Sequence, residues 1–137
     1  RIGMAFGSAK LITYLKAEKF SINSYTMSQD AIRIGTAAAS LADENYFKDV
    51  TDRILKTREE ALKRLTEMGF DVLDSSTNFL FVTHPEHRAS DLYSALKEKN
   101  IYVRYFNRPR IDDHLRITIG TPEEMEELYK ALQEVMK

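Results

Sequence analysis

The spacing of apolar residues changes at Gly69. Before it they recur three or four positions apart, which is typical of amphipathic helices, and after it they mostly alternate, which is typical of strands with one buried face. Ser8 and Ser28 supply capping hydroxyls for two helices, and Gly69 ends a third and longer one. The predicted helices of this half span residues 9–16, 29–42 and 45–68, with a polar, irregular stretch over residues 20–26.

The half that follows Gly69 predicts a small sheet crossed by one helix. The last helix opens with Thr121-Pro122-Glu123-Glu124, which places a capping hydroxyl, a proline and a glutamate where helix starts favour them. The predicted strands span residues 70–73, 78–83, 101–105 and 115–119, and the predicted helices span 89–99 and 121–137. We therefore predict an α/β fold with a mostly antiparallel sheet of three to four strands. Helices should pack on one face of it, and long linking helices should precede it.

The first seven residues predict a short buried strand that closes on a glycine turn, in Arg1-Ile2-Gly3-Met4-Ala5-Phe6-Gly7. A single strand cannot form a sheet by itself, and the chain begins with arginine rather than methionine. We therefore expect the chain to be the carboxy-terminal piece of a larger protein.

Composition narrows the class of partner. The 137 residues carry a net charge of -1 with a pI near 6.4, which argues against general binding to nucleic acid or to a membrane surface. There is no cysteine, and no apolar run approaches the length that spans a bilayer. We expect a cytoplasmic protein that binds a small molecule and meets any anion with local positive charge.

The three histidines offer no metal site that the sequence can identify. His84 and His87 flank a proline in a predicted strand-to-helix loop, and no carboxylate stands at a recognisable ligand spacing. His114 follows two aspartates at a hairpin, where an exposed turn histidine is a simpler interpretation than a catalytic base. We predict no metal ligand in this chain.

Two arginines stand out because they lie inside apolar, β-branched runs. Arg104 and Arg116 occur in neighbouring predicted strands, and alternation lets both project from the face that the helices do not cover. Guanidinium stays charged and requires an anionic partner. A site for a small anion is one interpretation, and the other is a pair of surface arginines that snorkel or pair with Asp112 and Asp113.

The run Asn107-Arg108-Pro109-Arg110-Ile111-Asp112-Asp113-His114-Leu115-Arg116-Ile117-Thr118-Ile119-Gly120-Thr121 resembles the carboxy-terminal signature of histidinol-phosphate aminotransferases, which are fold-type I enzymes that use pyridoxal 5'-phosphate. The resemblance extends upstream to segments 78–82, 43–47, 23–26 and 1–3. It implies that residues 43–137 form the carboxy-terminal small domain. Residues 1–42 would be a remnant of the large cofactor domain together with linking helices.

The resemblance also implies roles for single residues. The lysine that forms the Schiff base lies a few residues before the position matching Arg1, so no catalytic residue is assigned within this chain. Arg1 matches the arginine that contacts the cofactor phosphate. Arg116 matches the arginine for the substrate carboxylate, and Arg104 matches one near the phosphate of histidinol phosphate. Asn78 and Tyr25 match weaker candidates for contacts with the substrate.

Three further expectations follow from the resemblance. The intact protein would be a homodimer in histidine biosynthesis, and this chain by itself would be inactive. An aminotransferase for aromatic or other amino acids, or a phosphothreonine decarboxylase relative, remains an alternative within the enzymes. A non-catalytic module that binds a small anion at Arg104 and Arg116 is the alternative from another class.

Overall fold

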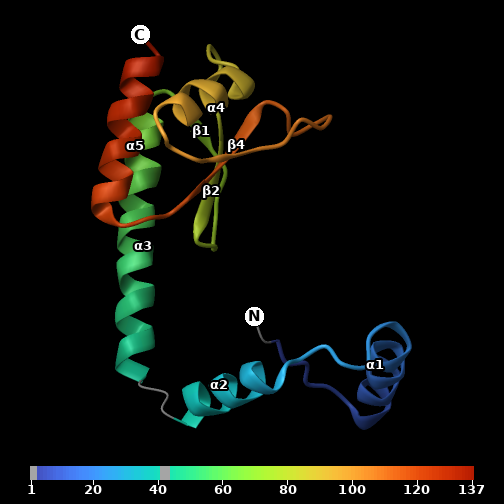
Figure 1. Cartoon of the computed structure of the whole chain (residues 1–137). Coiled ribbons are helices and arrows are strands. Elements are labelled where there is room, and N and C mark those ends of the chain that lie inside the picture. Colours follow the sequence, from blue (N-terminus) through green and yellow to red (C-terminus); the bar gives the residue numbers. More distant parts are fainter. Residues whose placement is uncertain (1–2, 41–43) are drawn as a thin grey trace. The chain divides into compact units, whose positions relative to one another are not determined.

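The computed structural model describes residues 3–40 and 44–137. The chain divides into two compact units, residues 1–44 and residues 45–137, each of which is described by itself (Figure 1). The division lies close to the predicted boundary between residues 42 and 43, and the assignment of the first part to a larger cofactor domain stays a prediction.

The first unit contains two helices, α1 (Ala9–Ile22) and α2 (Gln29–Ser40). Their starts follow the predicted caps, because Ser8 Oγ accepts the Leu11 N–H at 3.3 Å and Ser28 Oγ accepts the Ala31 N–H at 3.1 Å. Helix α1 is longer than predicted and takes in the start of the stretch expected to be irregular. No described residue of either helix is buried.

The strand predicted over residues 1–7 is wrong for its described part. Residues 3–7 have no regular secondary structure, and Met4 and Phe6 are 81% and 87% exposed. A strand is held by backbone hydrogen bonds to a neighbouring strand. All described strands of the protein belong to the sheet of the second unit and pair there with one another. The apolar pattern of residues 3–7 therefore lacks the partner that would turn it into a strand.

Helix α3 (Glu44–Glu67) is the predicted long amphipathic helix. Ala61 and Leu65 on its apolar side are fully buried. The helix ends as predicted at Gly69, which adopts a φ of +91° that a glycine tolerates without strain. The Phe70 N–H donates to the Leu65 carbonyl at 3.0 Å, so this carbonyl of the last helical turn has a hydrogen-bond partner.

Four strands form one antiparallel sheet in the order β1-β2-β4-β3. Helix α4 (Ala89–Glu98) lies in sequence between β2 and β3, and α5 (Pro122–Val135) starts with the predicted capping box at Thr121 and Glu124. The predicted α/β fold is confirmed, although the two edge strands are shorter than expected. The strands are β1 (Asp71–Val72), β2 (Phe79–Thr83), β3 (Arg104–Tyr105) and β4 (His114–Thr118).

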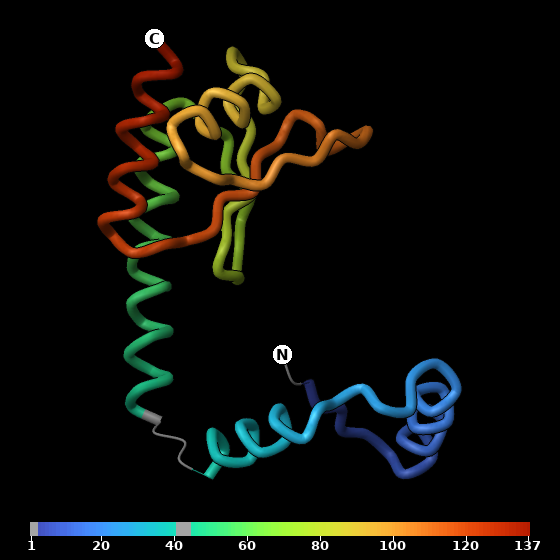
Figure 2. The backbone as a smooth tube through the Cα atoms, in the orientation of Figure 1, coloured from blue at the N-terminus to red at the C-terminus, as the bar shows by residue number. Residues whose placement is uncertain are grey.

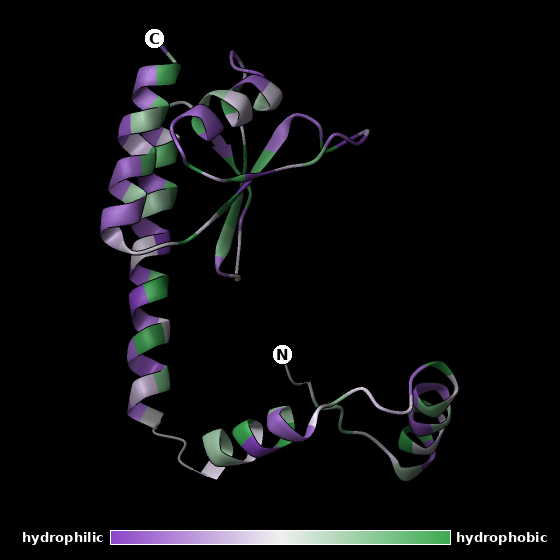
Figure 3. Cartoon of the chain, in the orientation of Figure 1, coloured by the Kyte–Doolittle hydropathy of each residue, from purple (hydrophilic) through white to green (hydrophobic). Residues whose placement is uncertain are grey.

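One face of this sheet carries the core. Every second residue of β2 and β4 is buried, and these residues pack with side chains of α3, α4 and α5. Figure 3 colours β2 largely as apolar. Helices α3 and α5 run side by side in Figure 2, and Arg64 Nη2 of α3 lies 3.3 Å from Glu126 Oε2 of α5. The fully buried large side chains are Leu65, Leu80, Val82, Leu96, Leu115, Ile117 and Leu132.

Candidate anion site

The sheet face opposite the core carries aromatic and positively charged side chains. Alternation along β2 turns Phe79 and Phe81 to this face, and alternation along β4 turns His114 and Arg116 to it. These residues are less buried than their neighbours on the core face. We call this surface the open face.

Arg104 and Arg116 stand directly opposite each other on β3 and β4. Residues paired in this way project from the same side of the sheet, so the prediction that both arginines share the non-helical face is confirmed. Phe81 of β2 is the partner of Arg116 on its other side. The open face therefore presents a row from β3 through β4 to β2 that consists of Arg104, Arg116 and Phe81.

Neither arginine has a carboxylate partner within the described residues, where the ion pairs involve other side chains. Asp113 pairs instead with His114, so the alternative in which it would pair with the arginines does not hold. Two like charges directly opposite on adjacent strands repel each other. An anion bound between Arg104 and Arg116 would turn that repulsion into attraction.

Two phenylalanines, Phe79 and Phe106, lie beside the two guanidinium groups, and the Phe81 ring contacts that of Phe106. We call Phe79, Phe81 and Phe106 the aromatic bed. The guanidinium carbon of Arg116 lies 5.1 Å from the ring centre of Phe79 and 5.9 Å from that of Phe106. The corresponding distance from Arg104 to Phe106 is 5.3 Å. Ring faces attract cations at this range and restrict where the guanidinium groups can go.

The Nε atom of Arg116 is buried without a hydrogen-bond partner in the described part of the chain. Leaving such a donor unpaired costs about 1–3 kcal/mol, and more when the group is charged. A carboxylate or a phosphate can accept hydrogen bonds from Nε and a terminal nitrogen together, because the fork of the guanidinium matches two oxygens. The unpaired donor is the structural observation that makes Arg116 a candidate for binding an acidic group.

The expectation of an exposed turn histidine at position 114 is wrong. His114 begins β4, and its side chain is only 16% exposed. The ring stacks on Phe81, with 4.5 Å between ring centres and 16° between planes. Its Nδ1 lies 2.5 Å from Asp113 Oδ1, and the hydrogen bond with His114 lowers the pKa of the Asp113 carboxyl. The pairing of β4 with β2 brings the ring onto the open face, which the local turn pattern did not reveal.

The remaining predicted site residues are Asn78, Tyr25 and Arg1. Asn78 precedes β2 and is exposed, and its carbonyl accepts the Ile119 N–H at 2.9 Å. Tyr25 belongs to the first unit and is 93% exposed. Arg1 lies outside the described residues. The roles predicted for these three residues stay predictions.

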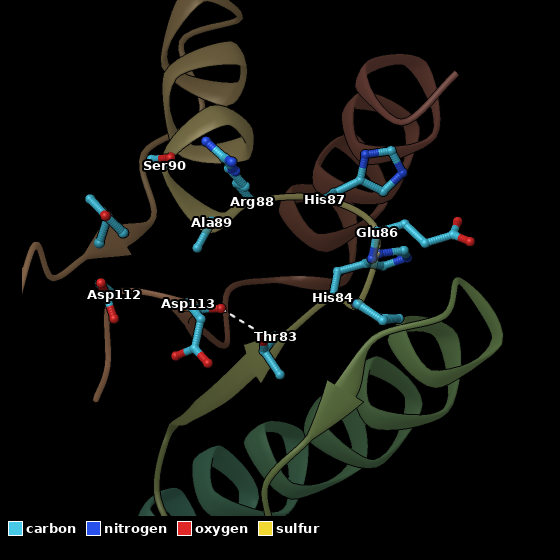
Figure 4. A pocket seen from close by; sticks show the side chains of 11 residues that line it. Thr83, His84, Glu86, His87, Arg88, Ala89, Ser90, Asp112 and Asp113 are labelled. Atoms are coloured by element: carbon cyan, nitrogen blue, oxygen red, sulfur yellow. Dashed lines mark hydrogen bonds between the residues drawn. The ribbon is translucent and has the colours of Figure 1, made fainter. Parts of the chain in front are cut away.

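A hollow of the second unit with a volume of about 710 Å³ lies at the end of β2 and the start of α4 (Figure 4). Both nitrogens of His84 are engaged there, since Nδ1 accepts the Glu86 N–H and Nε2 lies 3.3 Å from the Met68 carbonyl. The His87 ring lies tilted against that of His84, with 4.7 Å between ring centres and 56° between planes. Within the described ranges, no three histidine, aspartate or glutamate side chains come together in an arrangement that could hold a metal ion.

Sequence reasoning identified the two arginines but missed the aromatic bed. The signal was available, because Phe79 and Phe81 occupy alternate positions of one strand and Phe106 lies two residues after Arg104. What the pattern did not contain was the register of β2 against β4, which decides that Phe81 faces Arg116.

The model of the family described as aminotransferase class I and II matches residues 1–132. The chain belongs to this family. It is 48% identical over 137 residues to the histidinol-phosphate aminotransferase of Lactococcus lactis subsp. cremoris (strain MG1363), covering all of this chain and 38% of that protein. It is 47% identical over 135 residues to the histidinol-phosphate aminotransferase of Marinomonas sp. (strain MWYL1), covering 97% of this chain and 38% of that protein.

Among solved structures, the family fold recurs in the histidinol-phosphate aminotransferase of Sinorhizobium meliloti in complex with pyridoxal-5'-phosphate. The TM-score is 0.71 at 30% identity, and the match covers 88% of this chain and 33% of that one. The chain thus spans about 38% of the length of the two curated relatives above. Separately, none of the helices in the described part of the chain combines the length and apolarity needed to cross a membrane.

Proposed function

We propose that this chain is the carboxy-terminal portion of a histidinol-phosphate aminotransferase. The enzyme would move an amino group between L-histidinol phosphate and 2-oxoglutarate with pyridoxal 5'-phosphate as cofactor. Family membership and the relatives that are 43–48% identical support this reading. The observation in the molecule that carries it is the arginine pair on the open face, where the buried Nε of Arg116 has no hydrogen-bond partner among the described residues.

Both proposed substrates carry an acidic group away from the reacting amine or ketone. In this proposal Arg116 binds the carboxylate of glutamate or 2-oxoglutarate, and Arg104 lies near the phosphate of histidinol phosphate. Because the two arginines are cross-strand partners, one acid can be contacted by both guanidinium groups. Holding the acidic end fixes the reacting end, and such orientation supplies several kcal/mol of barrier lowering in enzymes.

Pyridoxal phosphate, when bound, supplies an electron sink for the transfer of the amino group. The unpartnered Nε of Arg116 fits the acid of a substrate held beside such a cofactor. Arg1 is the residue of this chain that we propose to contact the cofactor phosphate, and Asn78 and Tyr25 are proposed as further substrate contacts. The reacting lysine would come from outside these 137 residues, so the isolated chain should be inactive.

The same proposal includes a homodimer in the cytoplasm. Within this proposal, the exposed apolar surface of the first unit packs against the rest of the complete polypeptide or against a second copy. The described large apolar side chains of that unit that are exposed are Met4, Phe6, Leu11, Tyr14, Leu15, Phe20, Ile22, Tyr25, Met27, Ile32 and Ile34.

The test is a steady-state assay of the complete polypeptide that the reading frame encodes, loaded with pyridoxal phosphate. We expect turnover with histidinol phosphate and 2-oxoglutarate, and we expect Arg116→Ala to lower kcat/KM by at least a hundredfold, as loss of a charged, bidentate contact does. Arg104→Ala should weaken the binding of histidinol phosphate more than the binding of glutamate. Arg53→Ala is the matched control, because Arg53 is an exposed arginine of α3 that hydrogen-bonds its own helix.

Other outcomes would redirect the proposal. A clear preference for phenylpyruvate over the histidinol phosphate pair would make the protein an aromatic aminotransferase of the same family. Binding of phosphate at the arginines without any turnover in the complete polypeptide would favour a non-catalytic anion module. Unchanged kinetics in Arg116→Ala would reject the site itself.

A further inference from the structure

A histidine adjoins the arginine pair on the open face without touching either arginine. His114 lies two residues before Arg116 on β4, so both side chains leave the same side of the sheet. Its ring contact is with Phe81, and its ion pair is with Asp113. The proposed function above gives this histidine no task.

The ring of His114 is held in place from two directions. Asp113 Oδ1 lies 2.5 Å from Nδ1, and the neighbouring Thr83 hydroxyl donates to the Asp113 carbonyl at 2.6 Å. Thr83 is also the cross-strand partner of His114, so the tether spans β2 and β4. A side chain that is 16% exposed, stacked and tethered in this way has little rotational freedom left.

Two phenylalanine rings, Phe81 and Phe106, connect the fixed imidazole to the arginines by successive contacts. It lies nearly flat against Phe81, and Phe81 meets Phe106 edge to face with 6.3 Å between ring centres. Phe106 in turn lies within 6 Å of both guanidinium groups, at 5.3 Å from Arg104 and 5.9 Å from Arg116. Each ring in this series limits the positions available to the next, because packed aromatic rings prefer a few geometries.

We propose that His114 is a positioning residue for the anion site: its ring, tethered by Asp113, fixes the aromatic bed so that Arg104 and Arg116 are ordered before an acid binds. An arginine that is already ordered loses less rotational freedom when it binds an acid, which increases affinity. The effect should fall on binding rather than on the chemical step. This inference rests on the proposed function, since it concerns the acid that the arginines hold.

The experiment uses the complete, cofactor-loaded polypeptide and three substitutions at one position. His114→Ala removes ring and tether, His114→Gln keeps a donor for Asp113 without a ring, and His114→Phe keeps a ring without the donor. We expect His114→Ala and His114→Gln to raise KM for both substrates by roughly three- to tenfold, with the change falling on KM rather than kcat. His114→Phe should recover only part of the loss, because it keeps the ring but not the hydrogen bond to Asp113.

A second readout is independent of turnover. Inorganic phosphate should bind the complete protein more weakly in His114→Ala and His114→Gln, by a similar factor measured by titration calorimetry. His87→Ala is the matched control, because His87 also contacts a neighbouring ring but lies in the loop before α4. It should leave KM and phosphate affinity within twofold of the parent protein. If His114→Ala fails to fold, the Gln and Phe variants decide the question by themselves.

Three results separate failure here from failure of the proposed function. If Arg116→Ala loses affinity while His114→Ala and His114→Gln do not, the histidine has no positioning role and the site stands. If His114→Phe is as impaired as His114→Ala, a ring at this position does not hold the aromatic bed in place, and the inference is overturned. If Arg116→Ala itself binds phosphate and substrates normally, the proposed site fails, and the role of His114 fails with it.

Discussion

Both units of this chain contain helices that start at a side-chain cap, yet among the described residues only the second unit has a buried core. In residues 3–40 every described side chain is at least partly exposed, whereas α3, α4 and α5 of the second unit bury their apolar sides against a sheet. Local signals at Ser8 and Ser28 start α1 and α2 just as Thr121 starts α5. The difference shows that capping and periodicity set where a helix begins, while packing supplies most of its stability.

The difference in stability between the two units should be largest when a leucine of α3 and a leucine of α1 are each replaced by alanine. Leu65→Ala in α3 removes a fully buried side chain and should lower the free energy of unfolding of the second unit by about 2–5 kcal/mol. Leu15→Ala in α1, where the side chain is 45% exposed, should change the free energy of unfolding of the same chain by less than about 0.5 kcal/mol. Urea denaturation followed by circular dichroism measures both. Equal losses would show that the first unit contributes to a core after all.

A pair of glycine substitutions tests the same contrast on a smaller scale. Gly69→Ala places a Cβ atom 2.9 Å from His84 Nε2 at a positive φ, so we expect a loss of about 1–3 kcal/mol. Gly3→Ala meets nothing within 4 Å and should be neutral within about 0.5 kcal/mol. The melting temperatures of the two variants give the comparison. A neutral Gly69→Ala would mean that the junction between α3 and β1 adapts more freely than its contacts suggest.

The smallest expected effect concerns acid stability. Hydrogen bonds from His114 and from Lys99 lower the pKa values of Asp113 and Glu134, respectively, below their ordinary values of 3.8 and 4.5. Since the folded-state pKa is the lower one, each contribution is complete above the ordinary value and is lost as pH falls through the lowered one. Denaturation measured between pH 7 and about 2.5 should show this decline in the second unit. Asp113→Asn together with Glu134→Gln should flatten it, and an unchanged slope would assign the acid sensitivity to other carboxyls.

Most elements of the fold were predictable because their signals are local. Gly69 and Thr121 mark helix ends through backbone geometry and capping, and both predictions hold within a residue or two. The strand predicted over residues 1–7 failed in its described part, residues 3–7, because an apolar stretch does not state whether a neighbouring strand will pair with it. Helix α1 runs past its predicted end without burying a described residue, so a local preference for helix was underestimated there.

The candidate site also has a part that the sequence predicted and a part that only the structure revealed. Arg104 and Arg116 were found because a guanidinium group inside an apolar strand is unusual, and alternation was enough to place both on one face. Phe79, Phe81 and Phe106 drew no attention, because phenylalanines in strands normally read as core residues. His114 was misjudged for a related reason, since the neighbouring aspartates suggested an exposed turn.

The sequence by itself determined the capped helix starts, the end of α3 at Gly69, the alternating strands, the family resemblance and the two arginines, because each depends on residues that are close together in the chain. The tertiary structure alone decided that Phe81 faces Arg116, that His114 stacks on Phe81, and that Arg116 Nε is buried without a partner. Those facts depend on the register between β2 and β4, which joins residues more than thirty positions apart. A shift of one residue in that pairing would reverse which side chains face one another across the sheet, and no local pattern encodes it.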